Sequence, residues 1–394
     1  MKKVLLIANF MDVNENTNNR FNYLSELLQN KCDLKVITST FCHRDKKQRE
    51  YKSNKNIHML YEPGYRKNIS LQRIYSHHVL AKNLKKYLNN LAEKPDIIYC
   101  AVPSLSFAKE AAKYAKENKI RFIIDVQDLW PEAFKMIINI PIISNIVFYP
   151  MKKNADYIYR NADDIVAVSD TYAERAAQVN KKYKNKLSVF LGTDLEYFDK
   201  CNQENRIDFN DNIVRIVYIG TLGHSYDLKC SIDALEILKK EEIKDIKLVV
   251  IGDGPLKQEF EDYANKKQIN SEFIGKLKYD KMVGQLCACD IAINPISKGA
   301  AQSIINKVGD YAAAGLPVVS TQECEEYRKL VDDCEIGFNC ENNNSKDLAE
   351  KIRILYLDKE LRNKLGYNNR TLAEKKFDRK HTYNYIVKLI ESEE

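Results

Sequence analysis

A lysine and an aspartate stand three residues apart in the segment SIINKVGDYAAAGLPVVS, residues 303–320. This spacing places Lys307 and Asp310 on one face of a short predicted helix, with Asn306 beside the lysine. An ammonium group near the start of a helix adds to the positive end of the helix dipole, so it could hold a phosphate. The plain alternative is an ion pair in solvent, which stabilises a helix by roughly 0.2–0.5 kcal/mol.

Small residues and a helix stop surround this pair. Alanines at 312–314 would let the helix pack closely on a sheet, Gly315 is suited to end it, and Pro317 prevents its continuation. This pattern predicts a fixed position for the lysine and the aspartate.

Three turns in the second half of the chain carry glycines directly after predicted strands. They read IVYIGTLG, VVIGDGPL and FIGKL. Glycine lets a backbone approach a phosphate closely, and the start of a following helix attracts negative charge. A tight connection explains each turn equally well, and G-x-G without a third glycine is a weak dinucleotide signal. The candidates are Gly220, Thr221, Leu222, Gly223, Gly252, Asp253, Gly254 and Pro255, with Ile274 and Gly275 offering main-chain groups to a base edge.

The candidate residues belong to an alternation of strands and helices. Short apolar runs such as VLLIANF and FIIDVQD have the length of buried parallel strands, and helical patterns lie between them. The polar stretch at 199–212 reads as a linker, after which the alternation restarts. We predict an α/β chain of two doubly wound Rossmann-like domains, residues 1–200 and 201–375, facing each other across a ligand-binding cleft. Residues 376–394 are expected to form a helix that packs back on the first domain.

Composition excludes several classes of protein. Hydrophobic residues make up 44% and charged residues 30% of the 394 residues, which is typical of globular domains. Residues 1–200 carry 33 lysines and arginines against 22 acidic residues, and the remainder carries 29 against 33. A basic first half suits an anionic surface, a phosphorylated substrate or plain solvent, and no motif that reads nucleic acid accompanies it. Ten cysteines without ligand spacing argue against zinc and disulfides and favour a reducing cytoplasm.

The longest apolar stretch, residues 136–151, is too short and too interrupted to span a bilayer. It could lie in a membrane interface, cover a core or line an acceptor cleft.

In their order along the chain, these motifs resemble the retaining GT-B-fold glycosyltransferases of family 4, group 1. Bacterial members that build capsule or O-antigen are the most similar. IGDGP resembles the family's donor-domain turn, and INKVGDYAAAGLPVV resembles its N-K-x-x-[DE]-Y-x-A-x-G-x-P-V segment. In the first half, DVQDLWPEAF, ADDIVAVSD and LGTDLEYF resemble D-x-x-D-L-W-P-E, A-D-x-[IV]-x-[AV]-V-S and N-G-[VT]-D-x-x-x-F. The motifs cover nearly the full length.

The resemblance implies roles for the matching residues of the second half. Lys307 would act in catalysis by holding the donor diphosphate. Asp310, at the second acidic position of the family's E-x7-E motif, would bind the ribose. The turn from Gly220 to Gly223 would meet the phosphates, and Ile274 with Gly275 would meet the base.

In the first half the resemblance implies an acceptor site. Asp128 would orient the acceptor or the sugar as the second catalytic residue, unless it only caps the helix that follows. Asn16, Asn18 and Arg20, after the first predicted strand, could contact the acceptor or the phosphates. An asparagine-rich loop in solvent is the alternative.

Several positions depart from the family pattern. Gln302 stands where the first acid of E-x7-E is usual. The contact that Gln302 and the neighbouring Ser303 would make with the donor sugar is therefore changed. Thr221 stands where many relatives have arginine, and Leu191 replaces an asparagine. His224 could supply part of the missing phosphate contact.

The implied reaction is transfer of a hexose-type sugar from a nucleotide sugar, with UDP as the first choice, and with retention of configuration. The acceptor would be a saccharide or a polyprenyl-diphosphate-linked saccharide. The chain has no D-x-D motif, so neither a metal nor a cofactor is expected. Basic clusters between residues 44 and 86 could meet an anionic membrane, which predicts a cytoplasmic protein, peripheral on the inner membrane face. The alternatives are a GT-B-fold sugar-nucleotide epimerase and a degenerate, non-catalytic membrane-associated assembly subunit.

Overall fold

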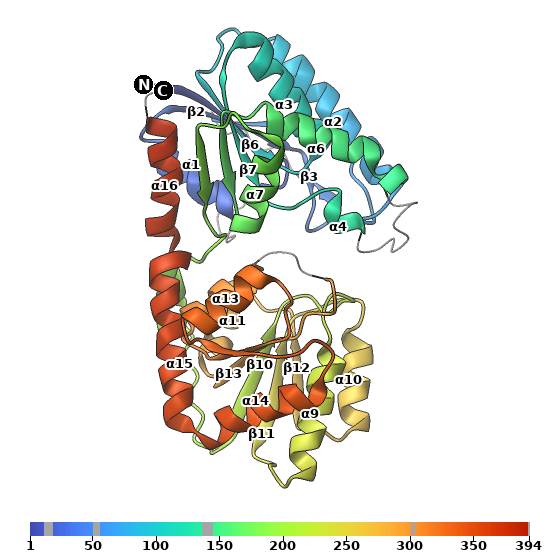
Figure 1. Cartoon of the computed structure of the whole chain (residues 1–394), viewed down its shortest axis with the longest axis vertical. Helices are drawn as coiled ribbons and strands as arrows, with labels where there is room; N and C mark the ends of the chain where they lie inside the picture. Colours follow the sequence, from blue (N-terminus) through green and yellow to red (C-terminus); the bar gives the residue numbers. More distant parts are fainter. Residues whose placement is uncertain (12–18, 50–55, 136–144, 301–303, 393–394) are drawn as a thin grey trace. The chain divides into compact units, whose positions relative to one another are not determined.

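The structure is a computed structural model, and it describes residues 1–11, 19–49, 56–135, 145–300 and 304–392 (Figure 1). These residues form two compact units. The first comprises Met1–Val189 together with Tyr383–Glu394, and the second comprises Phe190–Thr382. Each unit is built around its own parallel sheet.

The sheet of the first unit has the strand order β5-β2-β1-β6-β7-β8-β9, with neighbouring strands in parallel. Every residue of β6 and β7 is buried, as expected for central strands of a sheet covered on both faces. From β1 the chain adds strands first on one side and then on the other, so the order reverses between β1 and β6. The strands are β1 (Lys3–Ile7), β2 (Asp33–Ser39), β5 (Ile57–Leu60), β6 (Ile97–Val102), β7 (Arg121–Val126), β8 (Asp164–Ala167) and β9 (Asn185–Ser188), with a small antiparallel pair of β3 (Phe41–Cys42) and β4 (Lys47–Gln48).

The last helix of the chain, α16 (Arg379–Glu391), contributes to the core of the first unit. Its Tyr383, Ile386 and Ile390 join Phe21 and Leu24 of α1 in one buried cluster. In Figure 1 the red α16 lies beside the blue α1. The other helices of this unit are α1 (Arg20–Leu28), α2 (Leu71–Asn89), α3 (Leu105–Asn118), α4 (Glu132–Lys135), α6 (Tyr149–Arg160) and α7 (Asp170–Val179).

The sheet of the second unit has the order β12-β11-β10-β13-β14-β15, also parallel, and it reverses between β10 and β13. Its strands are β10 (Val214–Ile219), β11 (Ile246–Ile251), β12 (Ser271–Gly275), β13 (Ile291–Asn294), β14 (Val318–Ser320) and β15 (Gly337–Asn339). Its helices are α8 (Leu195–Glu204), α9 (Leu228–Lys240), α10 (Lys257–Lys266), α11 (Tyr279–Cys287), α12 (Lys307–Ala313), α13 (Glu325–Asp333), α14 (Ser345–Leu357) and α15 (Lys359–Leu372), followed by the π-helical turn η1 (Ala373–Phe377).

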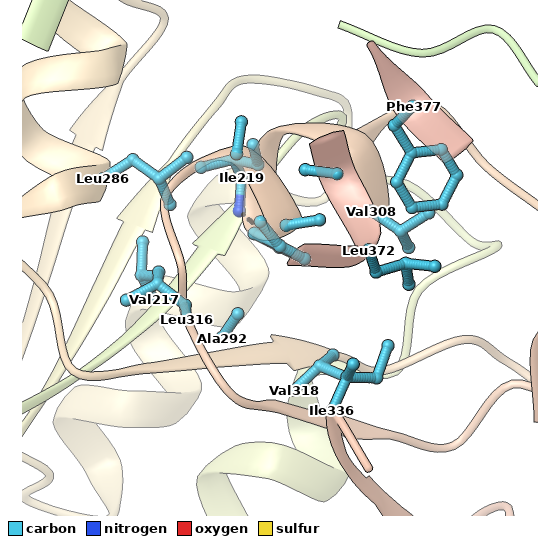
Figure 2. Packing of buried hydrophobic residues seen from close by; sticks show 14 of the residues in the cluster. Val217, Ile219, Leu286, Ala292, Val308, Leu316, Val318, Ile336, Leu372 and Phe377 are labelled. Atoms are coloured by element: carbon cyan, nitrogen blue, oxygen red, sulfur yellow. Dashed lines mark hydrogen bonds between the residues drawn. The ribbon is translucent and has the colours of Figure 1, made fainter. Parts of the chain in front are cut away.

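Alternate residues of β10 enter two different cores, because successive side chains of a strand point to opposite faces. Val217 and Ile219 join the cluster in Figure 2, which also holds Val308 of α12 and Leu316. Ile216 and Tyr218 join the core on the other side. The short α12 is therefore anchored directly on the sheet.

The predicted linker at 199–212 is wrong in its first part, and the predicted boundary at residue 200 differs from the division at Val189. Residues 195–204 form α8, whose Leu195, Phe198 and Cys201 are buried in the core of the second unit. The apolar residues recur every three positions among polar ones, so the stretch is polar on average but amphipathic as a helix.

Of the predicted apolar stretch 136–151, residues 136–144 lie outside the described residues. Among the residues that are described, no helix is both long and apolar enough to cross a membrane. The same part of the chain contains no group of three or more His, Cys, Asp or Glu side chains arranged to hold a metal ion.

Candidate functional site

The three glycine turns meet at the carboxyl edge of the second sheet, because β10, β11 and β12 are neighbours. The Gly220 amide donates to the Ile251 carbonyl at 2.9 Å, and the Leu222 amide donates to the Asp253 carbonyl at 3.0 Å. The Gly252 amide donates to the Gly275 carbonyl at 2.9 Å. The turns thus form one continuous backbone surface.

Two of these glycines are required by backbone packing. A Cβ atom on Gly252 would lie 1.8 Å from the Gly220 carbonyl oxygen, and one on Gly254 would lie 2.3 Å from the Leu222 carbonyl oxygen. Contacts this short exclude any side chain, so the close approach of the turns by itself explains both glycines. A Cβ atom on Gly223, in contrast, would make only an ordinary contact, with Thr221 Cγ2 at 3.9 Å.

The polar side chains of the first two turns are exposed at this edge. Thr221 and His224 point to solvent, and Pro255 is exposed beside them. The carboxylate of Asp253 accepts from the Gly254 amide at 2.8 Å, so it closes its own turn. Thr221 and His224 are therefore available to a ligand.

The third turn contains a bulge. Val250 pairs with Phe273 and Ile251 pairs with Gly275, so Ile274 is an extra residue in β12. Bulges leave one residue out of the strand ladder and are frequent next to functional sites. The main chain at Ile274 is therefore suited to the base-edge contact that the sequence predicts.

Lys307 is buried, with an exposed fraction of 8%, which contradicts the alternative of an ion pair in solvent. Its Nζ atom lies 3.9 Å from the centre of the Tyr218 ring and 3.8 Å from that of Tyr226. Within the described residues this ammonium has no hydrogen-bond partner. Burial lowers the pKa of Lys307 well below its usual value.

The position of Lys307 is linked to the first glycine turn. A Cβ atom on Gly220 would lie 3.2 Å from Lys307 Nζ, and Gly220 has a φ of +129°, which favours glycine. Gly220 thus leaves room for the ammonium at the turn. A buried ammonium without a carboxylate is costly, and aromatic rings compensate this cost only in part. The arrangement suits an anionic ligand.

Asp310 does not pair with Lys307, so the ion pair considered from the sequence is wrong. Asp310 Oδ1 instead accepts hydrogen bonds from Tyr279 Oη at 2.9 Å and Thr193 Oγ1 at 3.2 Å. Burial raises the pKa of Asp310 to about 6. The side chains of Lys307 and Asp310 point apart because neighbouring elements pack on several sides of α12. Each side chain therefore contacts a different part of the second unit.

Tyr311 fixes α12 on the sheet. Its hydroxyl donates to the Ile293 carbonyl at 3.1 Å and accepts from the Ile219 amide at 3.0 Å. These bonds attach the helix to β13 and β10 at the point where the strand order reverses. Asn306 is exposed at the start of the helix, while Gln302 and Ser303 lie outside the described residues.

In the first unit, Asp128 follows β7 and is half-buried. Its Oδ2 accepts from Trp130 Nε1 at 2.9 Å. Burial raises the pKa of Asp128. The carboxylate is therefore held by an indole, next to Arg73, whose guanidinium lies 4.4 Å from the centre of the Trp130 ring.

Arg20 requires a correction, because it is buried with an exposed fraction of 3%. Its Nε donates to Asp125 Oδ2 at 2.7 Å, and its Nη1 donates to the Val189 carbonyl at 2.8 Å. Tyr99 Oη also donates to this carboxylate, at 2.6 Å. A charge paired inside the protein is not available to an acceptor. Asn16 and Asn18 lie outside the described residues.

Sequence reasoning missed the aromatic and hydroxyl groups that hold the candidate side chains. Tyr218 and Tyr226 enclose the lysine, whereas Tyr279 and Thr193 hold the aspartate. Thr193 lies in the quoted LGTD motif and Tyr218 in the quoted IVYIGTLG segment, but neither motif indicated the contact that the side chain makes.

Known proteins match this chain most clearly in the second unit. Residues 199–372 match the family model described as "Glycosyl transferases group 1". This range contains the glycine turns and α12. Residues 199–372 belong to the group 1 glycosyltransferases. The predicted family is therefore confirmed for the unit that carries Lys307 and Asp310.

Two curated relatives are also glycosyltransferases. The uncharacterized glycosyltransferase MJ1178 of Methanocaldococcus jannaschii is 26% identical over 223 residues, which cover 56% of this chain and 57% of the relative. The capsular polysaccharide biosynthesis glycosyltransferase CapM of Staphylococcus aureus is 26% identical over 305 residues, which cover 75% of this chain and 76% of the relative. The chain thus spans little more than half of the first relative and about three quarters of the second.

A solved structure has a similar fold over the full chain. HepE of Anabaena, in complex with UDP and glucose, is 15% identical, has a TM-score of 0.68 and is covered completely in both chains. At this identity the likeness shows the fold alone. The predicted α/β chain of the GT-B kind, with two Rossmann-like domains, is confirmed.

Proposed function

We propose that this group 1 glycosyltransferase chain transfers a sugar from a nucleotide sugar, with a UDP-sugar first, to a saccharide or lipid-linked saccharide acceptor. The observation that carries the proposal is the buried Lys307 ammonium, which has aromatic rings and a glycine turn around it and no carboxylate partner among the described residues. A nucleoside diphosphate supplies the negative charge that this position lacks.

The proposed reaction needs no side-chain nucleophile. The bond between the anomeric carbon and the diphosphate oxygen breaks, and the acceptor hydroxyl oxygen bonds to that carbon from the same face. Because the new bond forms on the face that the diphosphate leaves, the configuration is retained, and the acceptor proton passes to the leaving diphosphate. Lys307 stabilises the charge that grows on the leaving oxygens. Asp310, held by Tyr279 and Thr193, is proposed to bind the ribose.

The acceptor side of the proposal rests on the first unit. We propose that Asp128, fixed by the Trp130 indole, orients the acceptor hydroxyl. Likeness to a capsular polysaccharide biosynthesis glycosyltransferase supports a role in surface polysaccharide synthesis, and transfer of a hexosyl group is part of the proposal. Transfer without a metal or cofactor, and action at the inner face of a membrane, are further parts of the proposal.

The first test is a thermal-shift screen with UDP-, GDP-, ADP- and dTDP-sugars on the parent and on Lys307→Met. A ligand at about 100 times its Kd stabilises the native state by about 2.7 kcal/mol, so one nucleotide should raise the unfolding temperature. Lys307→Met keeps the side-chain volume, removes the charge and should lose most of this rise. Lys229→Met is the matched control, because Lys229 is a half-exposed lysine of the same unit that pairs with Glu259.

A parent protein that responds to none of the four nucleotides would contradict the proposal. Incubation with the responding nucleotide sugar alone tests the epimerase alternative, since an epimerase yields an epimer without any acceptor. Equal transfer by Lys307→Met and the parent would show that the donor site is wrongly located.

A further inference from the structure

The first unit carries a groove of about 540 Å³ that the donor site does not use. It lies between the start of α2, the start of α3, and the segments around α4 and α6. Its apolar walls are formed by Ile69, Leu71, Ile74, Phe134, Phe148 and Met151.

The rim of this groove exposes large aliphatic side chains. Leu71 and Ile74 of α2 are 83% and 64% exposed, and Ile69 is 56% exposed. Soluble proteins seldom leave several such side chains together without a partner. The rim therefore offers a surface for an apolar ligand.

Aromatic rings continue the apolar surface inwards. The Phe134 and Phe148 rings stack with their centres 6.0 Å apart, and the Trp130 ring meets Phe134 edge-on at 4.8 Å. The aliphatic rim and this row of rings suit a long hydrocarbon chain better than a sugar.

The floor of the groove is charged and polar. Arg73 is only 9% exposed, and its guanidinium lies over the Trp130 ring. Its Nη1 donates to the Asn68 carbonyl at 2.8 Å, while its Nε has no hydrogen-bond partner in the described part of the chain. His77, 5% exposed, also lines the floor, and its Nε2 likewise has no hydrogen-bond partner there. Arg73 Nε and His77 Nε2 are therefore the nitrogens in this floor that a polar ligand would bond to.

Arg73 lines the groove itself, whereas the acids that interact with its charge, Glu62 and Asp128, do not. Within the described ranges Arg73 has no carboxylate in ion-pair distance, and Lys46 lies nearby over the Tyr65 ring. Glu62 is the buried acid next to His77, at 3.8 Å, but its oxygens already accept from Ser39 and Ser76. An anionic group on the ligand would complement Arg73.

We propose that this groove binds a lipid-linked acceptor, with its hydrocarbon chain along the apolar walls and its phosphate on Arg73. The proposal rests on the proposed function and names the acceptor class. The same Trp130 side chain that lies under Arg73 donates to Asp128, so a phosphate at Arg73 brings the attached sugar close to the proposed acceptor-orienting carboxylate.

Trp130 is the only tryptophan of the chain, so its fluorescence reports directly on the groove. The test titrates the full chain with farnesyl diphosphate, farnesol and inorganic diphosphate. Farnesyl diphosphate should change the emission saturably and at the lowest concentration, because only this probe carries both the chain and the charge. Saturation by farnesol at the same concentration would overturn the role of Arg73, and saturation by diphosphate alone would overturn the role of the groove.

Two variants separate the two parts of the site. Leu71→Glu places a charge on the rim without disturbing the core, and Arg73→Met removes the charge on the floor. Each should weaken farnesyl diphosphate binding by about tenfold or more. Leu357→Glu is the matched control, because Leu357 is 71% exposed on α14 of the second unit. Unchanged affinity in Leu71→Glu would refute the groove.

Two further measurements distinguish acceptor binding from membrane binding and separate the acceptor groove from the proposed sugar transfer. Vesicles of anionic phospholipid that change the Trp130 signal, with no saturable response to farnesyl diphosphate, would show a membrane surface and overturn the acceptor site. The UDP-dependent thermal shift should be unchanged in Leu71→Glu. A chain that binds farnesyl diphosphate but no nucleotide would contradict the proposed sugar transfer. A chain that binds a nucleotide but not farnesyl diphosphate would contradict only the acceptor groove.

Discussion

At the scale of single residues, the buried Lys307 ammonium has the largest energetic consequence. Replacing a buried, unpaired charge by an apolar side chain of similar volume removes its desolvation cost. We expect Lys307→Met to raise the free energy of unfolding of the ligand-free protein by about 1–3 kcal/mol in urea denaturation. Lys229→Met should change it by less than about 0.5 kcal/mol. A less stable Lys307→Met would mean that the Tyr218 and Tyr226 rings already compensate the charge.

Asp310 predicts a pH dependence of stability. Burial raises its folded-state pKa from 3.8 to about 6, so the folded protein binds more protons than the unfolded chain between these pH values. The contribution of Asp310 to stability is therefore present below pH 4 and is lost as the pH rises through 6. Asp310→Asn cannot titrate, and relative to the parent it should gain about 3 kcal/mol between pH 4 and 7. Denaturation series across this range measure the difference, and a constant difference would contradict the raised pKa.

At the scale of elements, the contact between the β10 and β11 turns sets which glycines can be replaced. In Gly252→Ala the new Cβ would meet the Gly220 carbonyl oxygen at 1.8 Å, which forces the two turns apart. We expect a loss of about 3 kcal/mol or more, as for other overpacked sites, together with loss of nucleotide binding. Gly223→Ala meets nothing closer than 3.9 Å and should stay within about 0.5 kcal/mol of the parent. Equal effects of the two variants would contradict the close approach.

The elements also show which features a sequence can predict. Strands such as β6 and β7 follow from local apolar runs, and the glycine turns follow from their place after strands. The surroundings of Lys307 could not be predicted, because α12 is far along the chain from Tyr218 and Tyr226 and meets them only through the order of the sheet. Arg20 was misjudged for the same reason, since its partner Asp125 lies 105 residues away. The stretch that forms α8 is polar on average, so its amphipathic pattern was read as a linker.

At the scale of the whole molecule, the C-terminal segment packs in the unit that the N-terminal part of the chain forms. Residues 383–394 belong to the first unit although they follow the second unit in the chain. The family match at 199–372 leaves this segment out, so the match by itself does not identify the helix as part of the first core. Its assignment depends on side chains that pack against α1.

The packing of α16 in the first core gives a prediction that the fluorescence of Trp130 can test. Ile386 is fully buried in the first core, so Ile386→Ala removes apolar contacts and leaves a cavity, at a cost of about 2–4 kcal/mol. Tyr385, the preceding residue, is 59% exposed, and Tyr385→Ala should change stability by less than about 0.5 kcal/mol. Because Trp130 lies in the first unit, its emission during urea denaturation should show a lower midpoint in Ile386→Ala alone. The same midpoint in both variants would place α16 outside the core, and retention of the UDP-dependent thermal shift in Ile386→Ala would show that the loss is confined to the first unit.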